Sequence, residues 1–214
     1  MAKQQYDSSE NISPRNLKRK SSLKRSLEIL EATRLLLSEQ GYDKLSLRKI
    51  AAITGIHLKT LQHYFPTKEI LIKATLEYVL SLYEKKIEEI SSHSTDPEKN
   101  FKNYMNYLVK DIKTIETAGF FYQLWAMAHV DKNTNNIMEK IYQGHTDSIE
   151  NLIKAINPDM GNHMRKQRAV MIAALIEGMM LFVGYGKKRP KNTAHIEKEI
   201  VALCTNLAVS NDSL

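Results

Sequence analysis

Apolar residues recur at helical spacing along most of the chain. Leu23, Leu27, Leu30 and Leu37 step by three or four residues, and Gly41 follows where a helix cap would stand. Prolines fall in the polar gaps, and no alternating segment of β type occurs. The pattern therefore predicts an all-α fold. Later segments with the same spacing predict helices over 68–90, 98–116, 118–130, 133–156, 162–184 and 194–208.

Two short helices are predicted within residues 46–65. A first apolar stripe begins at Leu47 and a second at Leu58, and Gly55 interrupts the pattern between them. Glycine tolerates the positive φ that a tight turn requires. This arrangement predicts a helix-turn-helix motif, with Ser46 as the N-cap of its first helix.

The second of these helices has a polar face, with almost no acidic charge, that suits the major groove of DNA. Arg48 can bind a guanine with two hydrogen bonds, Gln62 can bind an adenine, and the Thr60 methyl group can meet a thymine methyl. Lysine and tyrosine side chains are better suited to phosphates. His57 stands at the helix start, where it contacts either DNA or nothing. The expected DNA-contacting residues are Arg48, Lys49, His57, Lys59, Thr60, Gln62, His63, Tyr64 and Lys68.

Several spaced features of the first third agree at once: 29–42, the run 45–51, Gly55-Ile56, Thr60-Leu61 and the run 64–71. Together they closely resemble the amino-terminal domain of the TetR family of transcriptional regulators. The resemblance implies a DNA-binding domain followed by a helical domain that dimerises and binds a ligand. In that family, ligand binding typically pivots the fourth helix, separates the recognition helices and releases DNA. His57 and Gln62 depart from the family pattern, which usually has a small polar residue and a tyrosine there.

Positive charge is concentrated towards the N-terminus. Residues 1–70 hold 13 Lys and Arg against 7 Asp and Glu, so +6 of the formal net charge of +7 lies in the first third. This asymmetry favours a polyanion as the partner of that part. Residues 1–20 are expected to form a disordered basic tail, which either follows phosphates or stays solvated. The polar start and the single cysteine, Cys204, favour a cytoplasmic protein.

The last two predicted helices have the features of a dimer interface. Apolar residues recur at spacings of four, three and four along the last helix, and small residues on the helix before it allow a close approach. Two such hairpins would form a four-helix bundle about a twofold axis, although the same stripes could pack within one chain. A dimer would double the base contacts. The expected interface residues are Ala173, Ala174, Gly178, Ile196, Ile200, Leu203 and Leu207.

Aromatic residues and methionines gather in the middle and later part of the chain. Eight of the nine methionines follow Asn100, and both residue types line adaptable apolar pockets as well as ordinary cores. As a group they favour a small apolar or aromatic effector, with Gln123, His129 and Glu177 as polar anchors. A hydrogen bond across the bundle would equally satisfy Glu177. The candidate ligand-binding residues are Tyr104, Tyr107, Phe121, Tyr122, Trp125, His129 and Glu177.

The sequence contains no HExxH, no glycine-rich phosphate loop and no GxSxG, so we expect neither an enzyme nor a cofactor or metal site. Glu177 interrupts the apolar run 169–186, which argues against a membrane span. We expect a DNA-binding domain at 21–82, with its motif at 46–65, and a ligand-binding and dimerisation domain at 83–214. The expected function is a homodimeric repressor that a small effector releases from a palindromic operator. The alternative is a helical small-molecule-binding protein without sequence-specific DNA binding.

Overall fold

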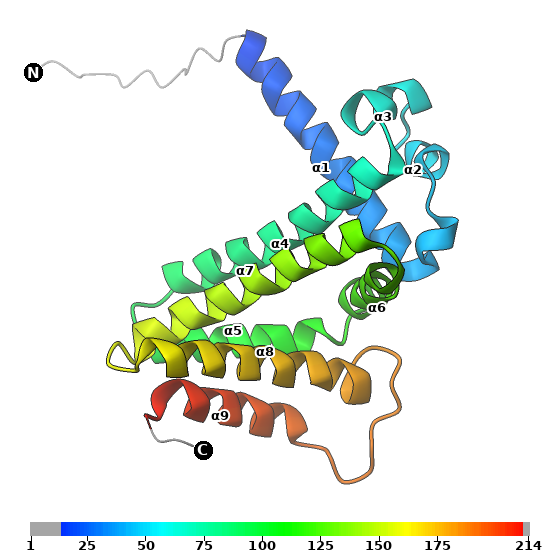
Figure 1. Ribbon diagram of the computed structural model, residues 1–214. Helices are drawn as coiled ribbons and strands as arrows, with labels where there is room; N and C mark the ends of the chain where they lie inside the picture. Colours follow the sequence, from blue (N-terminus) through cyan, green and yellow to red (C-terminus); the bar gives the residue numbers. More distant parts are fainter. Residues whose placement is uncertain (1–13, 212–214) are drawn as a thin grey trace, which may run out of the picture.

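The computed structural model describes residues 14–211, and within that range the chain consists of helices without any strand (Figure 1). The all-α prediction is confirmed. A short 3-10 helix, η1 (Tyr42–Lys44), follows the first helix. The α-helices are α1 (Pro14–Gln40), α2 (Leu47–Ile53), α3 (Leu58–Tyr64), α4 (Lys68–Ser92), α5 (Pro97–Asp111), α6 (Ile115–Val130), α7 (Lys132–Ile156), α8 (Asn162–Val183) and α9 (Ile196–Val209).

The first helix begins earlier than the sequence predicts. Residues 14–20 belong to α1, so the expectation of a disordered tail is wrong for them, and its remainder, 1–13, lies outside the described residues. Pro14 occupies the first helical position, where a missing N–H costs nothing because no intrahelical partner exists there. The helix therefore extends through the polar residues 14–20.

The helix-turn-helix motif forms as the sequence predicts. The Ser46 side chain caps α2 by accepting a hydrogen bond from the Lys49 N–H at 3.2 Å. Gly55 has φ +65°, and a Cβ atom there would meet nothing within 4 Å, so glycine is required by the turn and not by close packing. The buried side chains of Ile50 and Leu61 hold the two helices on the core.

The long helix α4 joins the two ends of the molecule. The Thr67 side chain caps it by accepting a hydrogen bond from the Ile70 N–H at 3.3 Å. Helix α4 packs against both α1 and α7, and α8 and α9 lie at the opposite edge of the molecule from α2 and α3 (Figure 1). One continuous apolar core includes Leu61 in the motif and Phe101 in the bundle. Within the described range, no helix is both long and apolar enough to cross a membrane.

The junction between α5 and α6 differs from the predicted one. Helix α5 ends at Asp111, and α6 begins at Ile115, because the Thr114 side chain caps α6 by accepting a hydrogen bond from the Thr117 N–H at 3.3 Å. The segment has no proline or glycine to mark this turn. The turn brings the Asp111 carboxylate within 2.9 Å of the Thr117 hydroxyl.

Helices α1 and α6 pack unusually closely. A Cβ atom on Gly119 would lie 2.3 Å from the carbonyl oxygen of Ser38, so only glycine fits at this position of α6. The Ser38 hydroxyl donates to the Glu116 carbonyl at 2.9 Å, and the Gln123 side chain accepts from the Tyr42 N–H at 3.1 Å. These residues form the α1–α6 contact, which ties the bundle to the N-terminal part.

Candidate functional site

The residues expected to contact DNA lie on α2, on α3 and at the helix ends beside them, at one corner of the molecule (Figure 1). Lys49 and Tyr64 are half-buried, and Lys68 is the half-buried first residue of α4. No acidic residue occurs between Leu45 and Lys68. The surface is therefore positively charged and rich in hydrogen-bonding groups, as a DNA interface requires. The exposed members are Arg48, His57, Lys59, Thr60, Gln62 and His63.

Two of the expected phosphate contacts already have partners within the protein. The Lys68 ammonium donates to the Tyr42 carbonyl at 3.0 Å and lies 3.6 Å from the centre of the Tyr42 ring. Burial lowers the pKa of Lys68. Lys49 donates to the Gln40 side chain at 2.5 Å. Lys68 therefore lies against Tyr42, and the phosphate contacts of Lys49 and Lys68 stay predictions that require these bonds to open.

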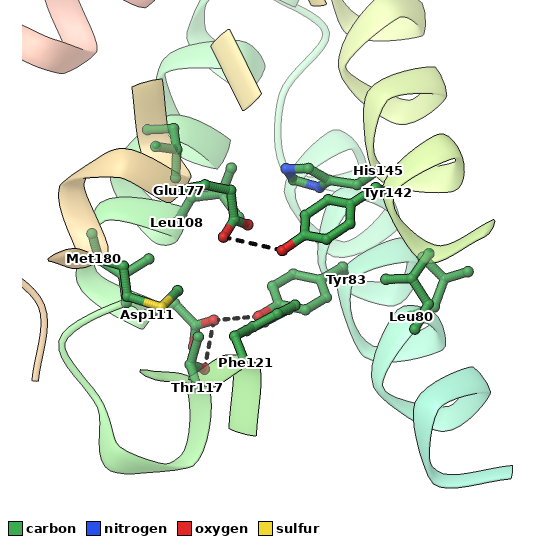
Figure 2. A pocket seen from close by; sticks show the side chains of 13 residues that line it. Leu80, Tyr83, Leu108, Asp111, Thr117, Phe121, Tyr142, His145, Glu177 and Met180 are labelled. Atoms are coloured by element: carbon green, nitrogen blue, oxygen red, sulfur yellow. Dashed lines mark hydrogen bonds between the residues drawn. The ribbon is translucent and has the colours of Figure 1, made fainter. Parts of the chain in front are cut away.

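A cavity lies inside the bundle, among α4, α5, α6, α7 and α8 (Figure 2). The empty space between its walls is about 460 Å³, of which about 30 Å³ can hold the centre of a water molecule. Little of the cavity in this structure is thus wide enough for a water molecule. Its lining residues are Leu80, Tyr83, Leu108, Asp111, Ile112, Thr117, Phe121, Ile141, Tyr142, His145, Ile176, Glu177 and Met180.

Asp111 lies at one side of the cavity with two hydroxyl donors. Tyr83 donates to its Oδ2 atom at 2.8 Å and Thr117 donates to the same atom at 2.9 Å (Figure 2). Burial nevertheless raises the pKa of Asp111, since removal from water penalises the charged form more than two hydroxyls stabilise it. Burial also raises the pKa of Tyr83 well above its ordinary value.

Glu177 projects into the cavity from α8. Its Oε2 atom accepts one long hydrogen bond, 3.4 Å, from the Tyr142 hydroxyl, which in turn accepts from the Trp125 indole N–H at 2.7 Å. Burial raises the pKa of Glu177 to about 7. His145 is buried beside them, and its Nε2 atom has no hydrogen-bond partner among the described residues. Burial lowers the pKa of His145 to about 4, so its ring is neutral at pH 7.

Residues 29–75 match the family described as "Bacterial regulatory proteins, tetR family". Over 162 residues the chain is 25% identical to the HTH-type transcriptional regulator PksA of Bacillus subtilis (strain 168), covering 74% of this chain and 78% of that protein. The amino-terminal part of this chain is therefore similar to the TetR family of transcriptional regulators. The relative is named as a transcriptional regulator, which supports a DNA-binding regulator.

Solved structures of TetR-type proteins share the fold. A TetR transcription regulator from Haloarcula marismortui ATCC 43049 is 18% identical with a TM-score of 0.64, covering 87% of this chain and 95% of that one. A protein assigned to the TetR family from Mesorhizobium loti MAFF303099 is 15% identical with a TM-score of 0.70, covering 87% and 96%. At these identities the likeness concerns the arrangement of the helices.

The candidate ligand-binding residues of this chain fall into two groups. Phe121 and Glu177 line the cavity. Trp125 does not line the cavity but donates a hydrogen bond to Tyr142, which does. Tyr104 is buried in the core, stacked on Tyr107 with ring centres 6.2 Å apart. The remaining candidates do not line the cavity. The Tyr122 hydroxyl donates to the Met180 carbonyl at 2.9 Å, and His129 is exposed on α6. Gln123, the other expected polar anchor, belongs to the α1–α6 contact.

Five polar side chains of the cavity are not among the residues that the sequence predicts: Tyr83, Asp111, Thr117, Tyr142 and His145. Tyr142 and His145 are separated by three positions on α7. Tyr83 is on α4, outside the aromatic residues from which the candidates come. A signal existed for α7, because a helix with a regular apolar stripe that also carries a histidine and a tyrosine on that stripe places polar groups inside a bundle.

The expected dimer residues are only partly accessible. Ala173 and Leu207 are buried within the chain, while Ala174 and Leu203 are exposed. The largest exposed apolar side chains of this region are on α8, and they recur at helical spacing with Ala174 and Gly178. We call this surface the α8–α9 face. Its members are Val170, Met171, Ala174, Gly178, Leu181 and Phe182 on α8, with Leu203 and Val209 on α9.

Proposed function

We propose that this TetR-family regulator is a homodimeric repressor that binds an inverted-repeat operator and leaves it when a small apolar or aromatic molecule enters the bundle cavity. As a repressor of transcription it would act in the cytoplasm. The observation that carries the proposal is the position of α6, which faces the cavity on one side and the DNA-binding part on the other. Thr117 and Phe121 line the cavity. On the other side of α6, Gly119 packs against the end of α1, and the Gln123 side chain accepts a hydrogen bond from Tyr42.

The small size of the cavity supports this mechanism. Only about 30 Å³ can hold the centre of a water molecule, which leaves no room for an organic effector, so binding must move the walls. A ligand shifts an equilibrium only when it prefers one arrangement over another. An effector that requires an enlarged cavity has that preference, because the arrangement described here excludes it. The cavity walls include parts of α4 and α6, and both helices pack on α1.

The α8–α9 face supports the homodimer. Phe182 is 64% exposed and Leu181 is 53% exposed, and Ala174 and Gly178 beside them allow a second helix to approach closely. Contiguous apolar side chains of this size usually mark an interaction surface. A twofold axis through this face would place the two α2–α3 corners on the same assembly, each against one half of an inverted repeat.

A selection experiment tests the proposed DNA recognition. Purified protein selects from random and source-genome DNA, and the winning site is then titrated at several salt concentrations. We expect an inverted repeat with a steep salt dependence and a preference of about a thousandfold or more over bulk DNA. Binding that is steep in salt but indifferent to sequence would reject the operator model and favour the alternative of a helical small-molecule-binding protein.

A further inference from the structure

The chemistry of the cavity restricts what it can bind. Two carboxyl groups, Glu177 from α8 and Asp111 from the end of α5, are turned into the same small space (Figure 2). No lysine or arginine is among its lining residues. Arg34 acts on Asp111 only through space, since its guanidinium is paired with Glu31 at 2.7 Å and does not line the cavity. The cavity therefore contains acids without a cationic partner, which is costly in an apolar interior.

A third group points to a ligand independently. His145 lines the same cavity, and its Nε2 atom is buried without a hydrogen-bond partner among the described residues. Buried polar atoms are almost always satisfied, so an orphaned one in a cavity wall indicates a missing partner. A neutral imidazole nitrogen that lacks its proton accepts a hydrogen bond, and both carboxylates also accept. The three groups together provide acceptors for a donor.

The remaining walls are apolar and aromatic. Phe121 and the rings of Tyr83 and Tyr142 stand around the cavity with several aliphatic side chains (Figure 2). Aromatic faces attract cations as well as apolar groups. Met180 and Leu80 are flexible side chains that can rotate to enlarge the space.

We propose that this cavity recognises a protonated amine with an apolar body. Its N–H groups donate to Glu177 and to His145 Nε2, and its positive charge offsets the negative charge of Asp111. The proposal rests on the function proposed above and assigns the chemical class of the effector. An anionic effector such as a fatty acid is excluded, because it would meet two acids and no cation. A neutral alcohol would supply one donor but would leave both carboxyl groups without a cationic partner.

Calorimetry with matched probes tests the amine assignment. The full chain is titrated at pH 7.5 with phenethyl, phenylbutyl and octyl compounds, each as the amine, the alcohol and the carboxylic acid. We expect at least one amine to bind, and about tenfold or more tighter than the alcohol and the acid of the same body. An alcohol or acid that binds as tightly as its amine, or the absence of binding by any amine, overturns the proposal.

The Glu177→Gln variant tests the site. It keeps the shape of the side chain and removes its charge, so amine affinity should fall about tenfold or more while the affinity of any alcohol that binds changes little. Glu88→Gln, at an exposed acid of α4 outside the cavity, should leave amine affinity unchanged. Equal amine affinity in wild type and Glu177→Gln overturns the site.

Operator binding, followed separately, distinguishes the two proposals. If an amine binds in calorimetry but does not displace operator DNA, the amine class stands and the repressor mechanism fails. If only an alcohol or an acid displaces operator DNA, the mechanism stands and the amine class fails.

Discussion

Two neighbouring cavity residues respond to pH in opposite directions. Burial raises the pKa of Glu177 from its ordinary 4.5 to about 7, so the stability from its protonated form is complete below pH 4.5 and is lost as the pH rises through 7. Burial lowers the pKa of His145 from 6.5 to about 4, so the stability from its neutral form is present above pH 6.5 and is lost as the pH falls through 4.

Glu177→Gln should isolate the first of these effects, because glutamine stays neutral at every pH. We expect the variant to exceed wild type in stability by about 3 kcal/mol at pH 8, with the difference shrinking as the pH approaches 4.5. Thermal melts at pH 8 and pH 5 measure it, with Glu88→Gln as the control. A stability difference that is the same at both pH values would contradict the assignment.

Arg48 and Lys59 are both exposed, but we expect different roles. Arg48→Ala should remove about 1–3 kcal/mol of discrimination at one base position, because a bidentate contact to guanine is lost. Lys59→Ala should weaken all DNA sites alike and lower the salt slope by about one. Anisotropy titrations on the selected operator and its single-base variants measure both. Equal losses across those variants for Arg48→Ala would sink the base-contact assignment.

Lys68 provides a sharper comparison, because its ammonium lies against Tyr42. In Lys68→Ala we expect a lower melting temperature and a smaller change in salt slope than in Lys59→Ala, since the lost contacts are mostly internal. The same salt titrations, with a thermal melt of each variant, measure this. A full unit of salt slope lost without any loss of stability would show that Lys68 contacts a phosphate when DNA is bound.

At the scale of elements, the sequence predicts most of the helices because their apolar stripes and caps are local. Ser46 and Gly55 mark the motif by their own chemistry, and the structure has both of them in the expected role. The α5–α6 junction is missed because its cap, Thr114, is an ordinary residue in a polar stretch. The cavity is missed in part because its polar groups come from five helices, and only tertiary packing decides which of them meet.

The α1–α6 contact gives a prediction at this scale. Gly119→Ala would push a methyl group into the Ser38 carbonyl, which is backbone and cannot rotate away, so we expect a loss of about 1–3 kcal/mol in unfolding free energy. Gly144→Ala is the matched control, since its methyl group would meet only the flexible Leu80 side chain at 3.3 Å. Urea unfolding measures both. A Gly119→Ala protein as stable as wild type would show that the helices separate at no cost.

At the scale of the whole molecule, the account requires a dimer through the α8–α9 face. Phe182→Asp places a charge in the middle of this face and should convert the dimer to a monomer, because a buried unpaired charge is costly. Val130→Asp is the control: Val130 is 81% exposed and lies at the end of α6. Sedimentation velocity distinguishes the two species. A Phe182→Asp protein that remains dimeric would place the interface elsewhere.

A ligand-responsive regulator requires that binding in the cavity changes the affinity for DNA, and one titration tests this coupling most directly. Operator affinity is measured without and with a saturating amount of whichever matched probe binds tightest, and probe affinity is measured without and with operator. We predict that the probe weakens operator binding and that operator weakens probe binding by the same factor, as thermodynamic linkage requires. Operator affinity that is unchanged at saturating probe would contradict a ligand-responsive regulator.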